Sequence, residues 1–303
     1  MAVVATGRTG GDPDGAGTDG EEVERLRAVA VDVAREVGEL TVAVRTSAVA
    51  DVATKSSDTD VVTAGDTAAE RLARELLARY RPGDPVQGEE EGGGEVAPGA
   101  VCWVVDPIDG TVNYLYGLPW WAVSVGAQRD GVALAGAVVQ PPSGRCWSAA
   151  RGRGAECDGS PLRVTPVSAL DRALLGTGFS YRAERRARQA VLVATLLPRV
   201  RDIRRTGSAA LDLCAVASGW LDGYVEHGLH RWDWAAGALI AAEAGAVLRL
   251  PGDAADGLGA ADGLGAADGL GAADGLGDAV LAAAPGIADD LVRLLRDCGA
   301  DRV

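Results

Sequence analysis

Two aspartates in the middle of the chain, Asp106 and Asp109, directly follow an apolar run from Val101 to Val105. The run is typical of a buried strand, and Pro107 prevents a simple helical continuation, so both carboxylates are expected at the turn after the strand. Neighbouring carboxylates repel each other unless a cation lies between them, and hard oxygen ligands favour Mg²⁺. The segment therefore predicts a magnesium site, although Asp and Gly also serve as ordinary turn residues.

Three further acidic positions could converge on the same site. Glu89 begins a run of three glutamates, a pattern that is usually a solvated face. Asp66 stands at the start of a helix expected to run to about Tyr80, and Asp233 precedes the apolar segment from Ala235 to Ala244. Either aspartate could be a helix cap and nothing more. Only a fold that brings them to the central pair would make them ligands.

The sequence resembles the inositol monophosphatase family at six places, which occur in the order that the family uses. These are residues 55–66, 88–90, 103–114, 205–210, 226–233 and 232–245. One such motif often arises by chance, whereas six in order are improbable. The resemblance covers about residues 22–250 and resumes over about residues 279–298.

The resemblance implies a set of metal ligands. Glu89, Asp106 and the backbone carbonyl of Ile108 would hold a first Mg²⁺. Asp106, Asp109 and Asp233 would hold a second, so that Asp106 bridges the two ions. Glu89 would also touch a weaker third ion, and two or three ions are therefore expected.

The resemblance also implies which residues activate water and bind phosphate. Thr111, paired with Asp66, would activate the attacking water. The backbone N–H groups of Gly110 and Thr111 would bind the phosphate, because free amides and the helix dipole at a helix N-terminus favour an anion. Glycine at position 110 would let the phosphate approach the backbone closely.

The remaining expected contacts concern the substrate. Its binding residues would be Asp109, Gly110, Thr111, Gly207, Ser208, Ala209 and Glu226. The Glu226 carboxylate suits the hydroxyl groups of inositol, but it would also suit a charged amine such as histidinol. Phe179 stands where some family members have a small polar residue. The basic segment from Arg182 to Arg188 could attract a phosphorylated substrate, yet a solvated helix face of mixed charge is the simpler interpretation.

Phosphate ester hydrolysis by metal-activated water needs no covalent intermediate, because two metals can neutralise both the entering and the leaving oxygen. The sequence is consistent with this, since it contains no Gly-x-Ser-x-Gly motif and no paired Cys and His. The two histidines, His227 and His230, are expected to be structural rather than metal ligands.

Composition and charge narrow the class of protein. The chain of 303 residues is 48% hydrophobic and carries a formal net charge of −14. Such a charge repels phosphate backbones and anionic lipids, so we expect neither nucleic acid nor membrane as a partner. Five dispersed cysteines in apolar surroundings are typical of reduced core thiols. Without a charged-then-apolar leader or a run of about eighteen apolar residues, the sequence predicts a soluble cytoplasmic protein.

The chain divides into three parts. Residues 1–20 lack periodicity and predict a disordered extension. In residues 21–170, helices are expected near Val23 to Val44 and Thr67 to Tyr80. Strand patterns follow them, including Ala122 to Gln128, Val132 to Val139 and Arg145 to Ala149, which predicts an antiparallel sheet flanked by helices. Residues 171–303 alternate strand-like and helical runs, as in α/β proteins. The resemblance implies an α/β (α+β) fold with layers in the order α-β-α-β-α, an antiparallel N-terminal and a mixed C-terminal sheet, and the metal site between the halves.

Residues 254–277 consist of four identical copies of Ala-Ala-Asp-Gly-Leu-Gly. One leucine and two glycines per copy cannot bury enough apolar surface to form a core, so a flexible insertion is predicted. A calcium-binding repeat is the alternative, but the glycine-and-aspartate nonapeptide pattern is absent.

The combined expectation is a Mg²⁺-dependent phosphomonoesterase that hydrolyses inositol 1-phosphate. On the resemblance, we also expect a homodimer that lithium inhibits. Phosphatases of histidinol phosphate, fructose 1,6-bisphosphate or nucleotide 3′-phosphates are the enzymatic alternatives. An alternative from another class is a non-catalytic regulator that binds a protein or RNA-processing partner, although the complete set of expected ligands weighs against it.

Overall fold

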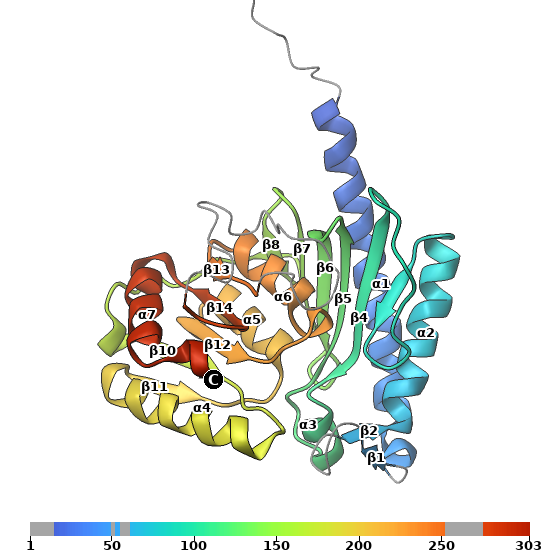
Figure 1. Cartoon of the computed structure of the whole chain (residues 1–303). Helices are drawn as coiled ribbons and strands as arrows, with labels where there is room; N and C mark the ends of the chain where they lie inside the picture. The colour runs from blue at the N-terminus through green and yellow to red at the C-terminus, as the bar shows by residue number, and fades with distance from the viewer. Residues whose placement is uncertain (1–14, 50–51, 55–60, 252–274) are drawn as a thin grey trace, which may run out of the picture.

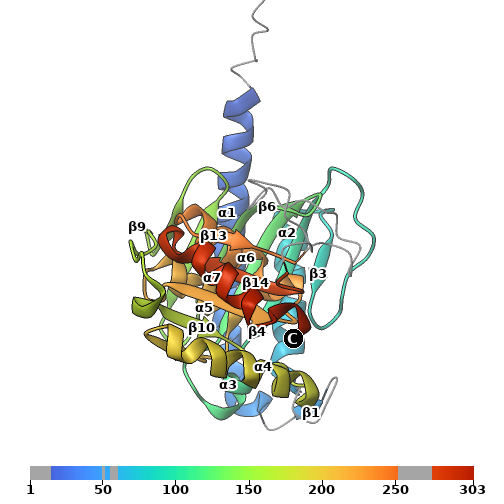
Figure 2. The ribbon, with the colours of Figure 1, turned by 60° about the vertical axis from the view of Figure 1, so that its left-hand side comes forward.

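The computed structural model describes residues 15–49, 52–54, 61–251 and 275–303, which form five layers of helix and sheet (Figure 1). Helices α1 and α2 cover the outer face of a seven-stranded sheet. Helices α5 and α6 lie between this sheet and a second, five-stranded one, and α4 and α7 cover the far side of the second sheet (Figure 2). The predicted order α-β-α-β-α is confirmed.

The outer helices α1 (Gly15–Ala48) and α2 (Ala64–Tyr80) are amphipathic. In α1 the wholly buried residues Leu26, Ala30 and Val33 recur every three or four positions, which places them on one face. This face packs against the large sheet, and the opposite face carries the charged residues. Small side chains in the contact let the helices lie close to the strands.

The large sheet carries the first acidic motif. Its strands, in spatial order, are β3 (Val86–Gly88), β4 (Val101–Asp109), β5 (Ala122–Arg129), β6 (Val132–Gln140), β7 (Arg145–Ala150), β8 (Ala155–Cys157) and β9 (Ser160–Pro161). Every residue of β4 is buried because helices cover both faces of the sheet. The three strands expected between residues 122 and 149 are confirmed, but the sheet is not wholly antiparallel, since β3 pairs parallel with β4.

The middle helices α5 (Ala209–Ala217) and α6 (Arg231–Glu243) are buried along almost their whole length. They show no polar stripe because sheets cover both of their sides. Their alanines and glycines allow close packing: a Cβ added to Gly136 in β6 would lie 2.9 Å from Cα and Cβ of Ala236 in α6. This contact holds the two halves of the molecule at a fixed distance.

The second sheet is mixed, as expected. Its strands, in spatial order, are β11 (Asp202–Arg204), β10 (Leu174–Thr177), β12 (Gly223–His227), β14 (Ala279–Ala283) and β13 (Val247–Arg249). Strand β10 pairs parallel with both neighbours, whereas β14 pairs antiparallel with both of its own. Helices α4 (Ala183–Leu196) and α7 (Pro285–Asp297) pack on its outer face.

Short elements complete the fold. The pair β1 (Val52–Thr54) and β2 (Val61–Thr63) is antiparallel and leads into α2, and α3 (Thr111–Tyr116) follows β4. Within the described ranges, 3₁₀ helices span Leu170–Arg172, Leu197–Arg199 and Ala300–Arg302. Among the described residues, no helix combines the length and the apolarity that crossing a membrane requires.

Two expected boundaries need correction. Helix α1 already begins at Gly15, whereas the extension was expected to run to residue 20; residues 1–14 lie outside the described part of the chain. Most of the repeat segment, residues 254–274, also lies outside it. In the last copy, Leu276 is only 1% exposed and packs in the core with α7, so this end of the segment predicted to be a flexible insertion belongs to the folded core.

Candidate active site

The central aspartates lie where β4 leaves the sheet. Pairing with β5 is regular up to Asp106 and resumes at Asp109, with a break in register between them at Pro107 and Ile108. The break turns both carboxylates towards the second half of the molecule. The N–H of Ile108 donates to Asp106 Oδ1 at 3.1 Å, which orients this carboxylate.

Asp233 reaches the same place from the other half. It lies in the first turn of α6, and its Oδ2 accepts a hydrogen bond of 2.6 Å from the N–H of His230. One carboxylate oxygen from each of Asp106, Asp109 and Asp233 lies within 4.8 Å of the others. The three acids therefore converge, as the sequence analysis expected. Asp233 does take part in capping α6, but it also lies in the acidic cluster.

Electrostatics at this cluster favour a bound cation. Burial raises the pKa of Asp109 to about 7, against hydrogen bonds from Ser208 and Ala210 that lower it. Burial and the nearby charges of Glu89 and Asp109 raise the pKa of Asp233 well above its ordinary value. Concentrated negative charge in a buried site is unfavourable without a counter-charge. Three hard oxygen donors at this spacing therefore fit a divalent cation such as Mg²⁺.

Glu89 and Ile108 line the same pocket as the three aspartates. Glu89 follows β3, and its N–H donates to the carbonyl of Val105 in β4 at 3.3 Å, so it stands beside the strand that carries Asp106. Its carboxylate is not part of the three-acid cluster. The solvated-face interpretation fails for Glu89, because it is half-buried and lines the pocket.

Thr111 and Asp66 form the expected pair. Thr111 Oγ1 lies 3.2 Å from Asp66 Oδ1 and 3.1 Å from the carbonyl oxygen of Ile108. The other carboxylate oxygen of Asp66 accepts from the N–H and the hydroxyl of Thr63, at 2.8 and 2.6 Å. Asp66 is wholly buried. It completes the capping box of α2, whose N-cap is Thr63, and it is also the partner of Thr111.

Gly110 has a backbone conformation that favours glycine. It caps α3 with φ of 93°, and a Cβ at this position would lie 3.0 Å from the carbonyl oxygen of Gly207. Gly207 itself has φ of 96° and lines the pocket. The two glycines bring backbone from both halves together beside Thr111.

The start of α5 holds Asp109. The N–H groups of Ala209 and Ala210 donate to its carboxylate at 3.3 and 2.8 Å, and the Ser208 hydroxyl donates to Oδ2. Ser208 also caps α5 by accepting from the N–H of Leu211 at 3.2 Å. Because Ser208 is buried and does not line the pocket, its observed role is to position Asp109, whereas the sequence suggested substrate contact.

Glu226 lies in β12 and lines the pocket. The hydroxyl of Tyr224 donates to its Oε2 at 2.6 Å, and burial raises the pKa of the carboxyl group. A Cβ on Gly178 would lie only 1.9 Å from Oε2, so Gly178 leaves the space that Glu226 occupies. Sequence reasoning missed both residues. Tyr224 lies two positions before Glu226 in β12, so the alternation of side chains along a strand could have indicated it. Gly178 is placed against Glu226 only because β10 pairs with β12.

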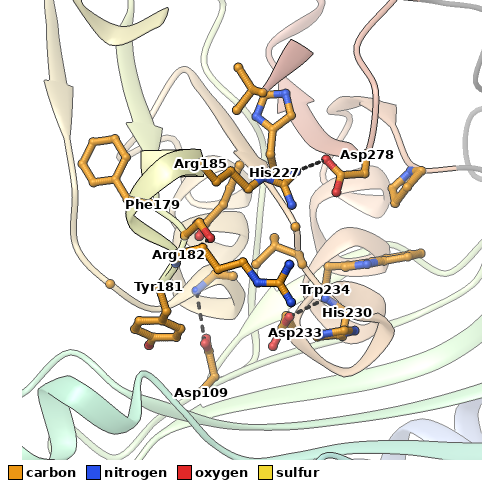
Figure 3. A pocket seen from close by; sticks show the side chains of 18 of the residues that line it. Asp109, Phe179, Tyr181, Arg182, Arg185, His227, His230, Asp233, Trp234 and Asp278 are labelled. Atoms are coloured by element: carbon orange, nitrogen blue, oxygen red, sulfur yellow. Dashed lines mark hydrogen bonds and ion pairs between the residues drawn. The ribbon is translucent and has the colours of Figure 1, made fainter. Parts of the chain in front are cut away.

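The pocket has a volume of about 1060 Å³ and a basic rim. Arg182, Arg185 and Arg188 from the start of α4 line it together with Arg205, and Arg182 points into it in Figure 3. Arg185 pairs with Asp278, and Phe179 also lines the pocket. Arg182 and Arg188 are exposed, as the interpretation of a solvated helix face of mixed charge expects, and they also line the pocket.

The histidines have structural contacts. His227 Nε2 lies 3.0 Å from the carbonyl oxygen of Ala300, and burial lowers the pKa of its ring. His230 stacks on Trp232. Neither histidine joins a cluster of metal-binding side chains in the described ranges. Lys55 begins the first of the six family motifs and was expected to supply a positive charge behind the metal ligands, whichever ester is the substrate; it lies outside the described residues.

Comparison with known proteins agrees with this geometry. The sequence pattern of the Inositol monophosphatase family matches residues 22–284. The chain is 52% identical over 253 residues to an inositol-1-monophosphatase of Mycobacterium leprae, covering 81% of each chain. It is 38% identical over 221 residues to a protein named Nus factor SuhB of Escherichia coli, covering 73% of this chain and 83% of that one.

A solved structure is similar over nearly the whole chain. Mycobacterium tuberculosis SuhB superposes with a TM-score of 0.73 at 44% identity, covering 91% of this chain and 98% of that one. The layered fold, the buried acidic cluster and these sequence matches agree. The chain therefore belongs to the inositol monophosphatase family of metal-dependent phosphatases and is a phosphoric monoester hydrolase.

Proposed function

We propose that this protein is a Mg²⁺-dependent phosphomonoesterase that hydrolyses inositol 1-phosphate to inositol and phosphate. The observation that carries the proposal is one pocket lined by the acidic cluster around Asp106, by Thr111 and by Glu226. The mycobacterial relatives named inositol-1-monophosphatase support the substrate.

The acidic residues would hold the metal ions in two groups. Asp106, Asp109 and Asp233 would hold one ion, and Glu89, Asp106 and the Ile108 carbonyl another; Glu89 would also contact a third. When bound, such ions lower the pKa of a coordinated water and neutralise charge on the phosphate and leaving oxygens. The buried carboxylates with raised pKa values are the feature that supports this arrangement.

Thr111 and Asp66 would control the proton of the attacking water. Thr111 Oγ1 can accept this proton while it donates its own to Asp66 Oδ1, the oxygen 3.2 Å away. Asp66 is held in place because its other oxygen is bonded to Thr63. The backbone N–H groups of Gly110 and Thr111 would orient the phosphate.

Glu226 would select the alcohol part of the substrate. With one oxygen bonded to Tyr224, the carboxylate keeps acceptor capacity for the hydroxyl groups of a polyol. Asp109, Gly207 and Ala209, which line the pocket, would complete this side. A substrate hydroxyl is a suitable partner because it donates a hydrogen bond to a carboxylate that is largely removed from water.

The test is phosphate release by the purified protein with Mg²⁺, using four esters. These are inositol 1-phosphate, histidinol phosphate, fructose 1,6-bisphosphate and a nucleotide 3′-phosphate. We expect the highest kcat/KM on inositol 1-phosphate, loss of turnover on every ester in Asp109→Asn, and a loss confined to inositol 1-phosphate in Glu226→Gln. A higher kcat/KM on another ester would contradict inositol 1-phosphate as the substrate, whereas metal-dependent phosphate ester hydrolysis would still hold.

The arginine rim favours a second candidate, a substrate that carries another anionic group, such as fructose 1,6-bisphosphate. Within the described residues, the guanidinium groups of Arg182, Arg188 and Arg205 form no ion pair. Arg182→Ala should then raise KM for the bisphosphate more than for inositol 1-phosphate. Arg186→Ala is the matched control, because its guanidinium bonds the carbonyl oxygens of Ser180 and Tyr181 instead.

Three further expectations accompany the proposal. Lithium should inhibit turnover, the protein should be a homodimer by light scattering, and it should be found in the cytoplasm by cell fractionation. Absence of turnover on all four esters would favour the alternative of a non-catalytic regulator, in line with the name Nus factor that the Escherichia coli relative carries.

A further inference from the structure

Helix α2 contains a wholly buried carboxylate, Glu70, that lies outside the pocket and bonds the loop after β3. Its Oε2 accepts from the N–H of Glu90 at 2.6 Å, and its Oε1 accepts from the N–H of Glu91 at 3.0 Å. Two consecutive backbone groups are thus tied to one side chain. They directly follow Glu89, the only member of the glutamate run that lines the pocket.

Arg74, one turn further along α2, completes the attachment. Its Nε and Nη2 donate to Glu70 Oε1 at 2.9 and 2.8 Å, which supplies a counter-charge for the buried carboxylate. Arg74 also donates to the carbonyl oxygen of Val86 in β3 at 3.2 Å and to that of Gly92. The pair therefore contacts both ends of the loop that carries Glu89.

The loop is shaped to receive this carboxylate. A Cβ on Gly88 would lie 2.2 Å from Glu70 Oε1, so only glycine leaves room for it. The N–H of Gly88 bonds the carbonyl oxygen of Gly92 at 3.0 Å and closes the loop. With residues 88, 90, 91 and 92 all held, little backbone freedom is left at Glu89.

We propose that Glu70 is a positioning residue that sets the Mg²⁺ affinity of the site by fixing the loop from Gly88 to Gly92 and hence the Glu89 carboxylate. The inference rests on the proposed function only in taking Glu89 as a metal ligand. It also gives α2 two roles, since Asp66, one turn before Glu70, bonds Thr111. Groups behind a ligand commonly change metal affinity 10- to 100-fold (about one to two orders of magnitude).

The experiment is Mg²⁺ titration by calorimetry of the full chain without substrate, on wild type and three variants. Glu70→Gln keeps an oxygen acceptor but loses the charge and one acceptor site, so Mg²⁺ should bind about tenfold or more weakly. Glu89→Gln should weaken binding at least as much. Glu75→Gln, which removes an exposed carboxylate from the same helix, should bind like wild type.

Kinetics distinguish positioning from general damage. In Glu70→Gln, kcat should recover at saturating Mg²⁺ with KM for the ester unchanged, because the loop affects only the ion. Arg74→Lys loses the paired Nε and Nη2 donors to Glu70, so it should also weaken Mg²⁺ binding, but less, with kcat restored at saturating Mg²⁺. This variant replaces Glu70→Gln in the test if Glu70→Gln does not fold.

Wild-type Mg²⁺ affinity in a folded Glu70→Gln would overturn the inference, as would an unaltered affinity in Glu89→Gln. The calorimetric result does not depend on which ester is hydrolysed. If inositol 1-phosphate is not the preferred ester, the role of Glu70 can still be correct. If Glu70 does not affect Mg²⁺ affinity, the phosphate-release assay can still identify the substrate.

Discussion

The two halves of the molecule contribute different things to the site. The first half presents acids from a strand end and a loop, with Asp106, Asp109 and Glu89 held by the large sheet and α2. The second half mainly presents helix starts: the first N–H groups of α5 bond Asp109, and the first turn of α6 carries Asp233. Neither half alone can assemble the cluster.

This difference locates the sensitive contacts of the enzyme. Partial positive charge at a helix N-terminus stabilises the charged carboxylate that the other half supplies. The site therefore depends on how closely α5 and α6 pack against the large sheet. Changes in the acids should abolish chemistry, whereas changes in the packing should weaken it in proportion to the displacement.

The largest effect is expected from Asp106→Asn in the first half. Removing the carboxylate shared by the expected ions eliminates several kcal/mol of charge stabilisation, so kcat should fall by about 1,000-fold or more. Steady-state phosphate release measures it. Asp171→Asn, an exposed aspartate outside the pocket, is the control and should keep full activity. Activity in Asp106→Asn above about one-tenth of wild type would refute the assigned role.

Thr111→Ala tests the proton path at the same strand end. Loss of a positioned proton-transfer group should lower kcat about 100-fold, with Mg²⁺ affinity unchanged because no ligand is removed. Stopped assays and calorimetry together measure this. A weaker Mg²⁺ affinity with normal kcat at saturation would mean that Thr111 orders the metal site instead.

Gly136→Ala tests the packing between the halves. Its new methyl group would press on Ala236 in α6 at 2.9 Å, which should destabilise the fold by about 1–3 kcal/mol and lower activity by displacing Asp233. Urea unfolding and kcat measure the two effects. Gly94→Ala, where nothing lies within 4 Å of the added carbon, should be neutral in both. Equal stability of the two variants would show that this contact does not fix the spacing.

The smallest effect concerns Asp212, a buried aspartate of α5 behind the pocket. Burial raises its pKa to about 8, although a hydrogen bond from Thr206 opposes the shift. The folded protein thus holds a proton here that the unfolded chain releases near its ordinary value of 3.8. This contribution to stability is complete below that value and is lost as pH rises through about 8.

Asp212→Asn should therefore flatten the decline in the free energy of unfolding of metal-free protein between the ordinary pKa of 3.8 and the folded pKa of about 8. Denaturant titrations at a series of pH values measure the slope. An unchanged slope would assign the pH dependence to the acids of the cluster itself.

The family resemblance carried by the six motifs implied the layered fold and the convergence of Asp106, Asp109 and Asp233, and the residue patterns predicted most helices and strands. Apolar periodicity predicted α1 and α2, and β-rich runs predicted β5 to β7, because local burial patterns follow secondary-structure period. The parallel pairing of β3 and the burial of Leu276 could not be predicted this way. Each depends on contacts with residues far away in the chain.

By itself, the sequence determined which chemical groups are available: hard oxygen ligands at a strand end, a hydroxyl beside them, and no alternative nucleophile motif. Only the tertiary structure decided what each group does. It assigned Ser208 to Asp109, Arg182 to the pocket rim and Glu70 to the loop of Glu89. The physical reason is that a hydrogen bond or a buried charge is defined by its partner, and these partners are brought together only when sheets and helices pack.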